Sequence, residues 1–245
     1  MTGVAGRTIT LNIEHSQSPR PAISLDGGDT WRRLSASEAP TDKIIVSFEE
    51  DEDEAELAFF EPSGYAETHQ EVRAMADDSP FASVESIGTS HMGREMLMVT
   101  VTDPRFPDDQ KHRVWMHSRA HAGEVTSTHS MLGFLEQVTE ESDLGDRLRQ
   151  HCIFNIVPLE NVDGVWAGHT RWDMQGKDPE REWCSPSIPS ALNIKAQVDP
   201  FMAGDNPIEV ALNMHSTRGD FTDTFFFKHL YPSVSRNFET IQQDF

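Results

Sequence analysis

Beyond residue 62 the chain alternates between strand and helix patterns, and this alternation constrains its fold more than any other feature. Strand character marks residues 95–102, 113–117, 152–157 and 208–214. Helical character marks residues 65–76 and 125–139, and the second of these segments places Met131, Leu132, Leu135 and Val138 on one face. Interleaved strands and helices are typical of an α/β domain with a largely buried mixed sheet. We therefore expect an α/β domain over residues 63–245.

The first 62 residues have a different pattern. Their periodic segments are short and strand-like, and they lie at residues 8–13, 44–48 and 56–60. A Gly-Gly-Asp turn and the acidic run 49–56 separate these segments, and no helical period is evident. We expect residues 1–62 to form a small β region ahead of the α/β domain.

Residues 158–207 hold several prolines and glycines and show little periodicity. We expect a long loop region here, and a loop of this length inside a compact domain is usually functional or disordered. The arginine and tryptophan residues within it argue against simple disorder.

The charge of the chain excludes some partners. Its 41 acidic residues outnumber its 20 Lys and Arg residues, which gives a formal net charge of −21. Such a surface repels nucleic acids and anionic membranes, so we expect neither as a partner. The two cysteines provide no disulfide framework. With no window of eighteen apolar residues and no apolar segment at the N-terminus, we expect a soluble, cytoplasmic protein.

The stretch His-Ala-Gly-Glu at 121–124 follows a predicted strand and precedes a predicted helix. This placement aims an imidazole and a carboxylate at one point, and we expect Gly123 to supply the backbone freedom for it. His121 and Glu124 are two-thirds of the His₂Glu set typical of catalytic zinc. His215, directly after the strand at 208–214, is the candidate for the third ligand. Alone, the His-x-x-Glu spacing also fits a helix-capping pair or a surface pair.

Further motifs follow in a consistent order. They are Asn161-Val-Asp-Gly164, Arg171, Asp178-Pro-Glu-Arg181-Glu-Trp183 and Met214-His215-Ser216. Together with 121–124 this series resembles the M14 zinc metallocarboxypeptidases, in particular the cytosolic-type branch, in which a β-sandwich domain precedes the catalytic domain. The stretches 55–65 and 90–94 resemble the end of that β domain and the start of the catalytic one. The resemblance covers roughly residues 55–230, and it implies a carboxypeptidase-like α/β fold with a mixed sheet.

The resemblance also implies roles for individual residues. His121, Glu124 and His215 would bind one zinc ion, and Asp178 would accept a hydrogen bond from the other ring nitrogen of His121. Arg171 would polarise the scissile carbonyl and stabilise the oxyanion. Arg181 would bind the terminal carboxylate of a peptide or protein substrate.

Two residues depart from the family pattern. Glu180 stands where the family usually has Asn, directly before the carboxylate-binding arginine. Asn213 stands where an aspartate is often found, two residues before the third ligand. We expect an anionic Glu180 to weaken capture of a substrate α-carboxylate, or to favour a substrate with a positive group nearby.

The resemblance further predicts that this chain is catalytically incomplete. The general-base glutamate of the family lies well downstream of the third ligand, whereas only thirty residues follow His215. These residues show strand character at 224–227 and helical character at 234–245. The β region is also short for the leading domain of the family. Both ends suggest a fragment of a longer protein, with a naturally reduced relative as the alternative.

The function that we expect is hydrolysis of the C-terminal peptide bond of peptides or proteins by a zinc-activated water. Two alternatives stay open. One is a zinc-dependent hydrolase of N-acyl amino acids, which would share the His-x-x-Glu and distant His pattern. The other is a non-catalytic pseudoenzyme that captures peptide tails.

Overall fold

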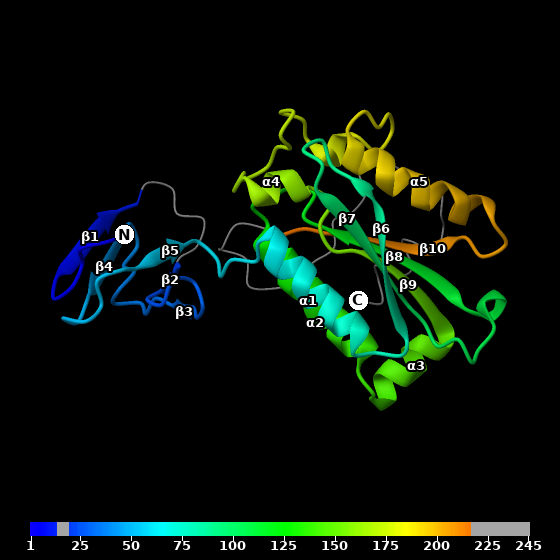
Figure 1. Ribbon diagram of the computed structural model, residues 1–245, viewed down its shortest axis with the longest axis horizontal. Coiled ribbons are helices and arrows are strands. Elements are labelled where there is room, and N and C mark those ends of the chain that lie inside the picture. Colours follow the sequence, from blue (N-terminus) through cyan, green and yellow to red (C-terminus); the bar gives the residue numbers. More distant parts are fainter. Residues whose placement is uncertain (14–19, 217–245) are drawn as a thin grey trace.

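A computed structural model describes residues 1–13 and 20–216 (Figure 1). The first five strands are β1 (Thr8–Asn12), β2 (Ala22–Ser24), β3 (Arg32–Arg33), β4 (Lys43–Ser47) and β5 (Glu56–Ala58). The following strands are β6 (Ala82–Thr89), β7 (Glu95–Val101), β8 (His112–Ser118), β9 (Cys152–Val157) and β10 (Ile208–Met214). The helices are α1 (Tyr65–Asp77), α2 (Val125–Thr139), α3 (Asp143–His151), α4 (Val162–Trp166) and α5 (Pro189–Ala203), with 3₁₀ turns at Asp108–Gln110 and Pro179–Arg181. The elements predicted at 224–227 and 234–245 lie outside the described residues.

The N-terminal part is all β among its described residues. Strands β1 and β4 form an antiparallel pair, and β2 pairs antiparallel with both β3 and β5. Apolar side chains of these strands and of the residues next to them, among them Ile23, Leu34 and Phe48, form a separate small core. Figure 1 shows these strands at one end of the molecule, apart from the α/β part. The division into residues 1–62 and 63–245 remains a prediction.

A five-stranded mixed sheet, in the order β10-β8-β9-β7-β6, forms the centre of the α/β part. Strand β8 pairs in parallel with β9 and with β10, whereas β7 pairs antiparallel with β9 and with β6. Parallel strands need crossover connections, and here helices α2 and α3 join β8 to β9. The expected α/β fold with a mixed sheet is therefore confirmed.

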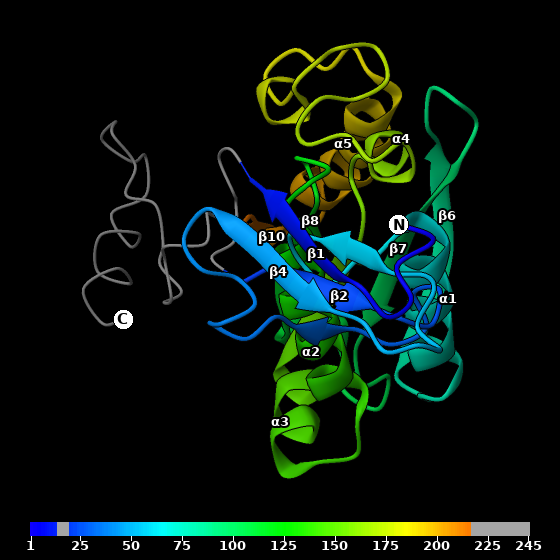
Figure 2. The same ribbon diagram turned by 90° about the vertical axis from the view of Figure 1, so that its left-hand side faces the viewer.

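Helices cover both faces of this sheet. Helices α1 and α2 pack on one face, where the predicted apolar stripe of α2, residues Met131, Leu132, Leu135 and Val138, is fully or almost fully buried. On the other face, residues of α4 and α5 pack against Trp115 and Met98 of the sheet. Figure 2 shows α4 and α5 on one side of the sheet and α2 and α3 on the other. Among the described helices none has the length and apolar character of a membrane span.

The expectation of a long loop over residues 158–207 is wrong in part, because this segment contains α4 and the fifteen-residue helix α5. Helix α5 shows little amphipathic periodicity, since it buries only Ser190, Ala191 and Ile194 and contains Pro200. The stretch between the two helices, residues 167–188, is irregular apart from one 3₁₀ turn and holds most of the predicted substrate-binding residues.

Candidate metal centre

The ends of two neighbouring parallel strands create the candidate metal centre. Met214, the last residue of β10, lies opposite Ser118, the last residue of β8, in the sheet register. Because both strands run in the same direction, the segments that follow them leave the sheet at the same edge. His215 and the loop 119–124 therefore meet there, although they are far apart in sequence.

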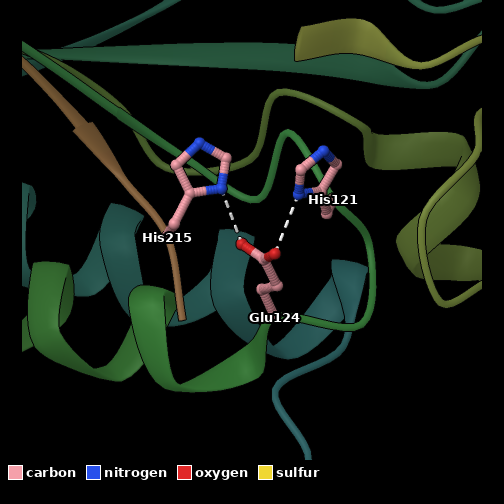
Figure 3. A group of neighbouring side chains, drawn as sticks. All are labelled: His121, Glu124 and His215. Carbon is pink, nitrogen blue, oxygen red and sulfur yellow. Dashed lines mark hydrogen bonds and ion pairs between the residues drawn. The ribbon is translucent and has the colours of Figure 1, made fainter. Parts of the chain in front are cut away.

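The three predicted metal ligands converge at this edge (Figure 3). Glu124 is the N-cap residue of α2, and its carboxylate lies between the two imidazole rings. Its Oε1 is 2.8 Å from His121 Nδ1, and its Oε2 is 2.7 Å from His215 Nδ1. One ligand atom from each of the three side chains lies within 4.8 Å of the others, and the ring centroids are 4.9 Å apart.

The charges of these groups favour a bound cation. Burial raises the pKa of Glu124, but the hydrogen bonds from His121 and His215 outweigh it and lower the pKa to about 2. Burial lowers the pKa of His215, but hydrogen bonds to Glu124 and Glu180 prevail and raise it to about 9. The site thus stabilises positive charge between its carboxylates. Two imidazole nitrogens and a carboxylate are also a ligand set that catalytic zinc takes, so the residues fit zinc.

The outward nitrogen of His121 faces a second carboxylate. Its Nε2 lies 3.2 Å from Oδ1 of Asp178, on the other side of the ring from Glu124. Asp178 Oδ2 accepts hydrogen bonds from Nε and a terminal nitrogen of Arg171, at 2.9 and 2.7 Å. Burial raises the pKa of Asp178, but the hydrogen bonds from Arg171 and His121 lower it below its usual value. Asp178 is therefore ionised at neutral pH and can accept a hydrogen bond from Nε2–H of His121.

The outward nitrogen of His215 also faces a carboxylate, which the sequence did not lead us to expect. Nε2 of His215 lies 3.2 Å from Oε2 of Glu180, and the same oxygen accepts a hydrogen bond of 2.7 Å from the side chain of Asn213. Arg181, the next residue, is exposed and makes no side-chain hydrogen bond or ion pair within residues 1–13 and 20–216. The side chain of Glu180 therefore interacts with the metal centre and not with its neighbouring arginine.

The role of Gly123 differs from our expectation. Its φ is not positive, so no unusual backbone conformation requires a glycine there. A Cβ at this position would lie 2.8 Å from the carbonyl oxygen of Thr170, to which the backbone N–H of Gly123 donates. Gly123 thus permits a close backbone approach between the ligand loop, residues 119–124, and the segment that carries Arg171.

Arg119 braces the start of the ligand loop. It has a φ of 59°, a left-handed conformation that is uncommon for a residue other than glycine. Its buried guanidinium donates to the carbonyl oxygens of Ala122 and Ser63 and to the hydroxyl of Thr128. These bonds tie the turn of 119–122 to the start of α2, where Glu124 lies.

The Asn-x-Asp-Gly motif has a structural role in the described residues. The side chain of Asn161 caps α4 by accepting a hydrogen bond from the backbone of Gly164. Asp163 accepts from Ser90 and forms an ion pair with Arg94, at 2.7 and 2.9 Å. Two motifs that seemed separate in the sequence, 90–94 and 161–164, are therefore parts of one network.

Two buried titratable side chains near the centre were not singled out as site residues from the sequence. Glu160 is fully buried, and burial raises its pKa to about 8. His117 lies 3.7 Å away and is also buried, which lowers its pKa to about 4. Within the described part of the chain neither oxygen of Glu160 has a hydrogen-bond partner. Both residues lie in apolar strand or post-strand contexts, and a strand pattern alone does not distinguish them from packing residues.

Comparison with known proteins extends these observations. The family model of the M14 peptidases, described as zinc carboxypeptidase, matches residues 68–219. Cytosolic carboxypeptidase 6 of Caenorhabditis elegans is 26% identical over 216 residues, which cover 81% of this chain and 47% of that protein. An uncharacterised protein of Zymomonas mobilis is 32% identical over 149 residues, which cover 59% of this chain and 37% of the relative.

A solved structure from Shewanella denitrificans, of a protein provisionally named carboxypeptidase A, superposes with a TM-score of 0.78 at 26% identity. It covers 100% of this chain, and this chain covers 65% of that structure. The chain therefore spans about half or less of the curated relatives described above and about two-thirds of this structure. The match to the family model extends over more than half of the chain and includes all the residues of the candidate centre. The chain belongs to the M14 family of zinc carboxypeptidases.

Proposed function

We propose that this chain carries the zinc site and the substrate-binding arginines of a metallocarboxypeptidase, which hydrolyses the C-terminal peptide bond of peptides or proteins. The observation that carries the proposal is the convergence of His121 and His215 on the two oxygens of Glu124. Because the chain spans only part of its relatives, the activity is proposed for the protein that contains this sequence. The C. elegans relative is named cytosolic, and we extend a cytoplasmic location to this protein as part of the proposal.

In this proposal Glu124 and the Nδ1 atoms of His121 and His215 hold one zinc ion. When bound there, zinc would polarise a substrate carbonyl and lower the pKa of a bound water to about 7. The carboxylate of Asp178 keeps the His121 ring in one orientation by accepting its Nε2–H. The acidic groups around the centre hold both imidazoles in place and compensate the charge of the cation.

Arg171 is the proposed stabiliser of the developing oxyanion. Asp178 holds its guanidinium through two N–H groups, and the other three N–H groups make no hydrogen bond within the described residues. Its side chain is 39% exposed, so these donors can reach a substrate. A fixed cation at such a position costs no reorganisation during the reaction, and loss of one oxyanion donor typically lowers kcat by about 10²–10³-fold.

Arg181 is the proposed anchor for the substrate α-carboxylate. It is exposed and unpaired among the described residues, and it is the last residue of the 3₁₀ turn that Asp178 caps. A charge-assisted pair with a carboxylate would add affinity that a C-terminally amidated peptide cannot obtain. If the bound substrate buries this pair, removal of one partner typically costs about 2–5 kcal/mol.

The test compares matched peptides that end in a free carboxylate or an amide, with the full natural gene product as the enzyme. We expect a much higher kcat/KM for the free acid, and we expect Arg181→Ala to remove most of that difference. Arg147→Ala, on the exposed face of α3, is the control and should leave it unchanged. Equal rates on acid and amide peptides would contradict the proposal, and turnover of N-acyl amino acids alone would favour the amide-hydrolase alternative. Zinc binding without any turnover would favour a pseudoenzyme.

A further inference from the structure

The 3₁₀ turn after Asp178 supplies a carboxylate to each of the two histidines. Each imidazole has its Nδ1 against Glu124 and its Nε2 against an acidic residue of this turn. The acidic residue is Asp178 for His121 and Glu180 for His215, and both contacts are 3.2 Å long. The role of Asp178 follows from the family resemblance, whereas that of Glu180 does not.

Several contacts hold Glu180 in this place. Its backbone N–H donates to Oδ1 of Asp178, which caps the turn. Its Oε2 accepts from Nδ2 of Asn213 as well as facing His215, and its side chain is 26% exposed. Asn213 and His215 are two residues apart at the end of β10, so their side chains leave the chain on the same side. The carboxylate of Glu180 therefore bridges two neighbouring groups on this strand end.

Glu180 and Asn213, the two residues that depart from the family pattern, are thus in contact with each other. Where the family usually has an amide at position 180 and often a carboxylate at position 213, this chain has the carboxylate at 180 and the amide at 213. A carboxylate and an amide therefore still lie next to His215. Here, however, the carboxylate belongs to the turn at 179–181 and the amide to the end of β10.

We propose that Glu180 is a positioning residue for His215, and that its carboxylate fixes the orientation and tautomer of this ring by accepting a hydrogen bond from Nε2–H. With Nε2 protonated, Nδ1 is left free to bind a metal beside Glu124. This inference rests on the proposed zinc site. It adds a second role to the expected one, in which Glu180 weakens capture of a substrate α-carboxylate or favours a substrate with a positive group nearby, because its carboxylate also contacts Asn213 and His215.

The test measures the zinc dissociation constant of purified protein by competition with a chelator. We expect Glu180→Ala to weaken zinc binding by about 10–100-fold, the usual effect of losing such an outer partner, and Glu180→Gln to weaken it less. Glu182→Gln is the matched control, because Glu182 lies in the same segment but interacts with Ser187 and Lys177. Glu180→Gln preserves the shape of the side chain, so it tests the charge even if the alanine variant is poorly folded.

A spectroscopic readout separates positioning from general stability. In ¹⁵N NMR spectra of the zinc-loaded protein, Glu180→Gln should shift the Nε2–H signal of His215 and leave that of His121 in place, with each ring signal assigned by its through-bond correlation to the backbone of the same histidine. Zinc affinity within twofold of wild type in both Glu180 variants, with an unmoved His215 signal, would overturn this inference and leave the zinc site intact. A wild-type protein that binds no zinc would overturn the proposed function itself.

Discussion

Oδ1 of Asp178 lies 3.2 Å from Nε2 of His121, on the side of the ring that faces away from Glu124. These residues are 57 positions apart, and the contact depends on the 167–178 segment folding back over the ligand loop. In the proposed zinc site, where Nδ1 of His121 binds the metal, an ionised carboxylate in this place would hold the proton of the ring on Nε2. The contact therefore links the geometry of the loop to the chemistry of the proposed zinc site.

We predict that Asp178→Asn weakens zinc binding by about 10–100-fold, because an amide accepts the Nε2–H less strongly and leaves Arg171 without its ion pair. Chelator competition measures the effect. Asp199→Asn, which removes an exposed partner of Lys195 on α5, is the control and should bind zinc like the wild type. Equal affinities in the two variants would show that Asp178 does not act on the site.

The close approach at Gly123 gives a prediction about stability. Gly123→Ala places a Cβ 2.8 Å from the carbonyl oxygen and 3.0 Å from the Cα of Thr170, and both are backbone atoms that cannot turn aside. We expect a loss of about 1–3 kcal/mol in the free energy of unfolding, the usual range for overpacking, together with weaker zinc binding.

Gly133→Ala provides the matched control for that substitution. Gly133 lies inside α2, and nothing is within 4 Å of a Cβ built there. Alanine at this position should stabilise the protein by about 0.5–1 kcal/mol, since glycine is a poor helix former. Urea denaturation measures the free energy of unfolding of both variants. An unchanged or raised value in Gly123→Ala would refute the proposed close contact.

Glu160 gives a prediction about pH. Burial raises its pKa from 4.5 to about 8, so the folded protein keeps this proton while the unfolded chain has already lost it. Its contribution to stability is therefore fully present below about pH 4.5 and is lost as the pH rises to about 8. Each pH unit in this window should reduce the free energy of unfolding by up to about 1.4 kcal/mol.

Glu160→Gln should remove this dependence, because glutamine does not ionise. The measurement is the free energy of unfolding at several pH values in this window, for the wild type and the variant. Glu136→Gln, on the exposed side of α2, should keep the wild-type slope. The same slope in Glu160→Gln and in the wild type would contradict the assignment of this titration to Glu160.

Sequence periodicity predicted the strands and helices that have one strong apolar signal. Strands β9 and β10 and helix α2 begin and end at the predicted residues, because each has a continuous apolar run or a clear apolar stripe. Strand β6 was not predicted, since its sequence ASVESIGT is polar and only Ile87 is buried. Helix α5 was not predicted either, because its buried residues are few and mostly small.

Sequence patterns also predicted only some of the residues of the candidate site. Strand ends and motif order were enough to bring His121, Glu124 and His215 together as a hypothesis. The contact between Glu180 and His215 was not predictable, because it depends on how the turn at 179–181 lies against the end of β10. No periodicity encodes that relation, and the nearest sequence signal was the pair of departures at positions 180 and 213.

The measurement that tests the central claim most directly is the zinc content of the purified protein by elemental analysis. We predict one zinc ion per chain in the wild type and its loss in His121→Ala, Glu124→Ala and His215→Ala. His129→Ala is the control, because His129 lies on the exposed side of α2 and contacts only the carbonyl oxygen of Glu61 among its hydrogen-bond partners in the described residues. This variant should keep its zinc. Zinc absent from the wild type, or present equally in all four variants, would contradict the assignment of His121, Glu124 and His215 as the ligands.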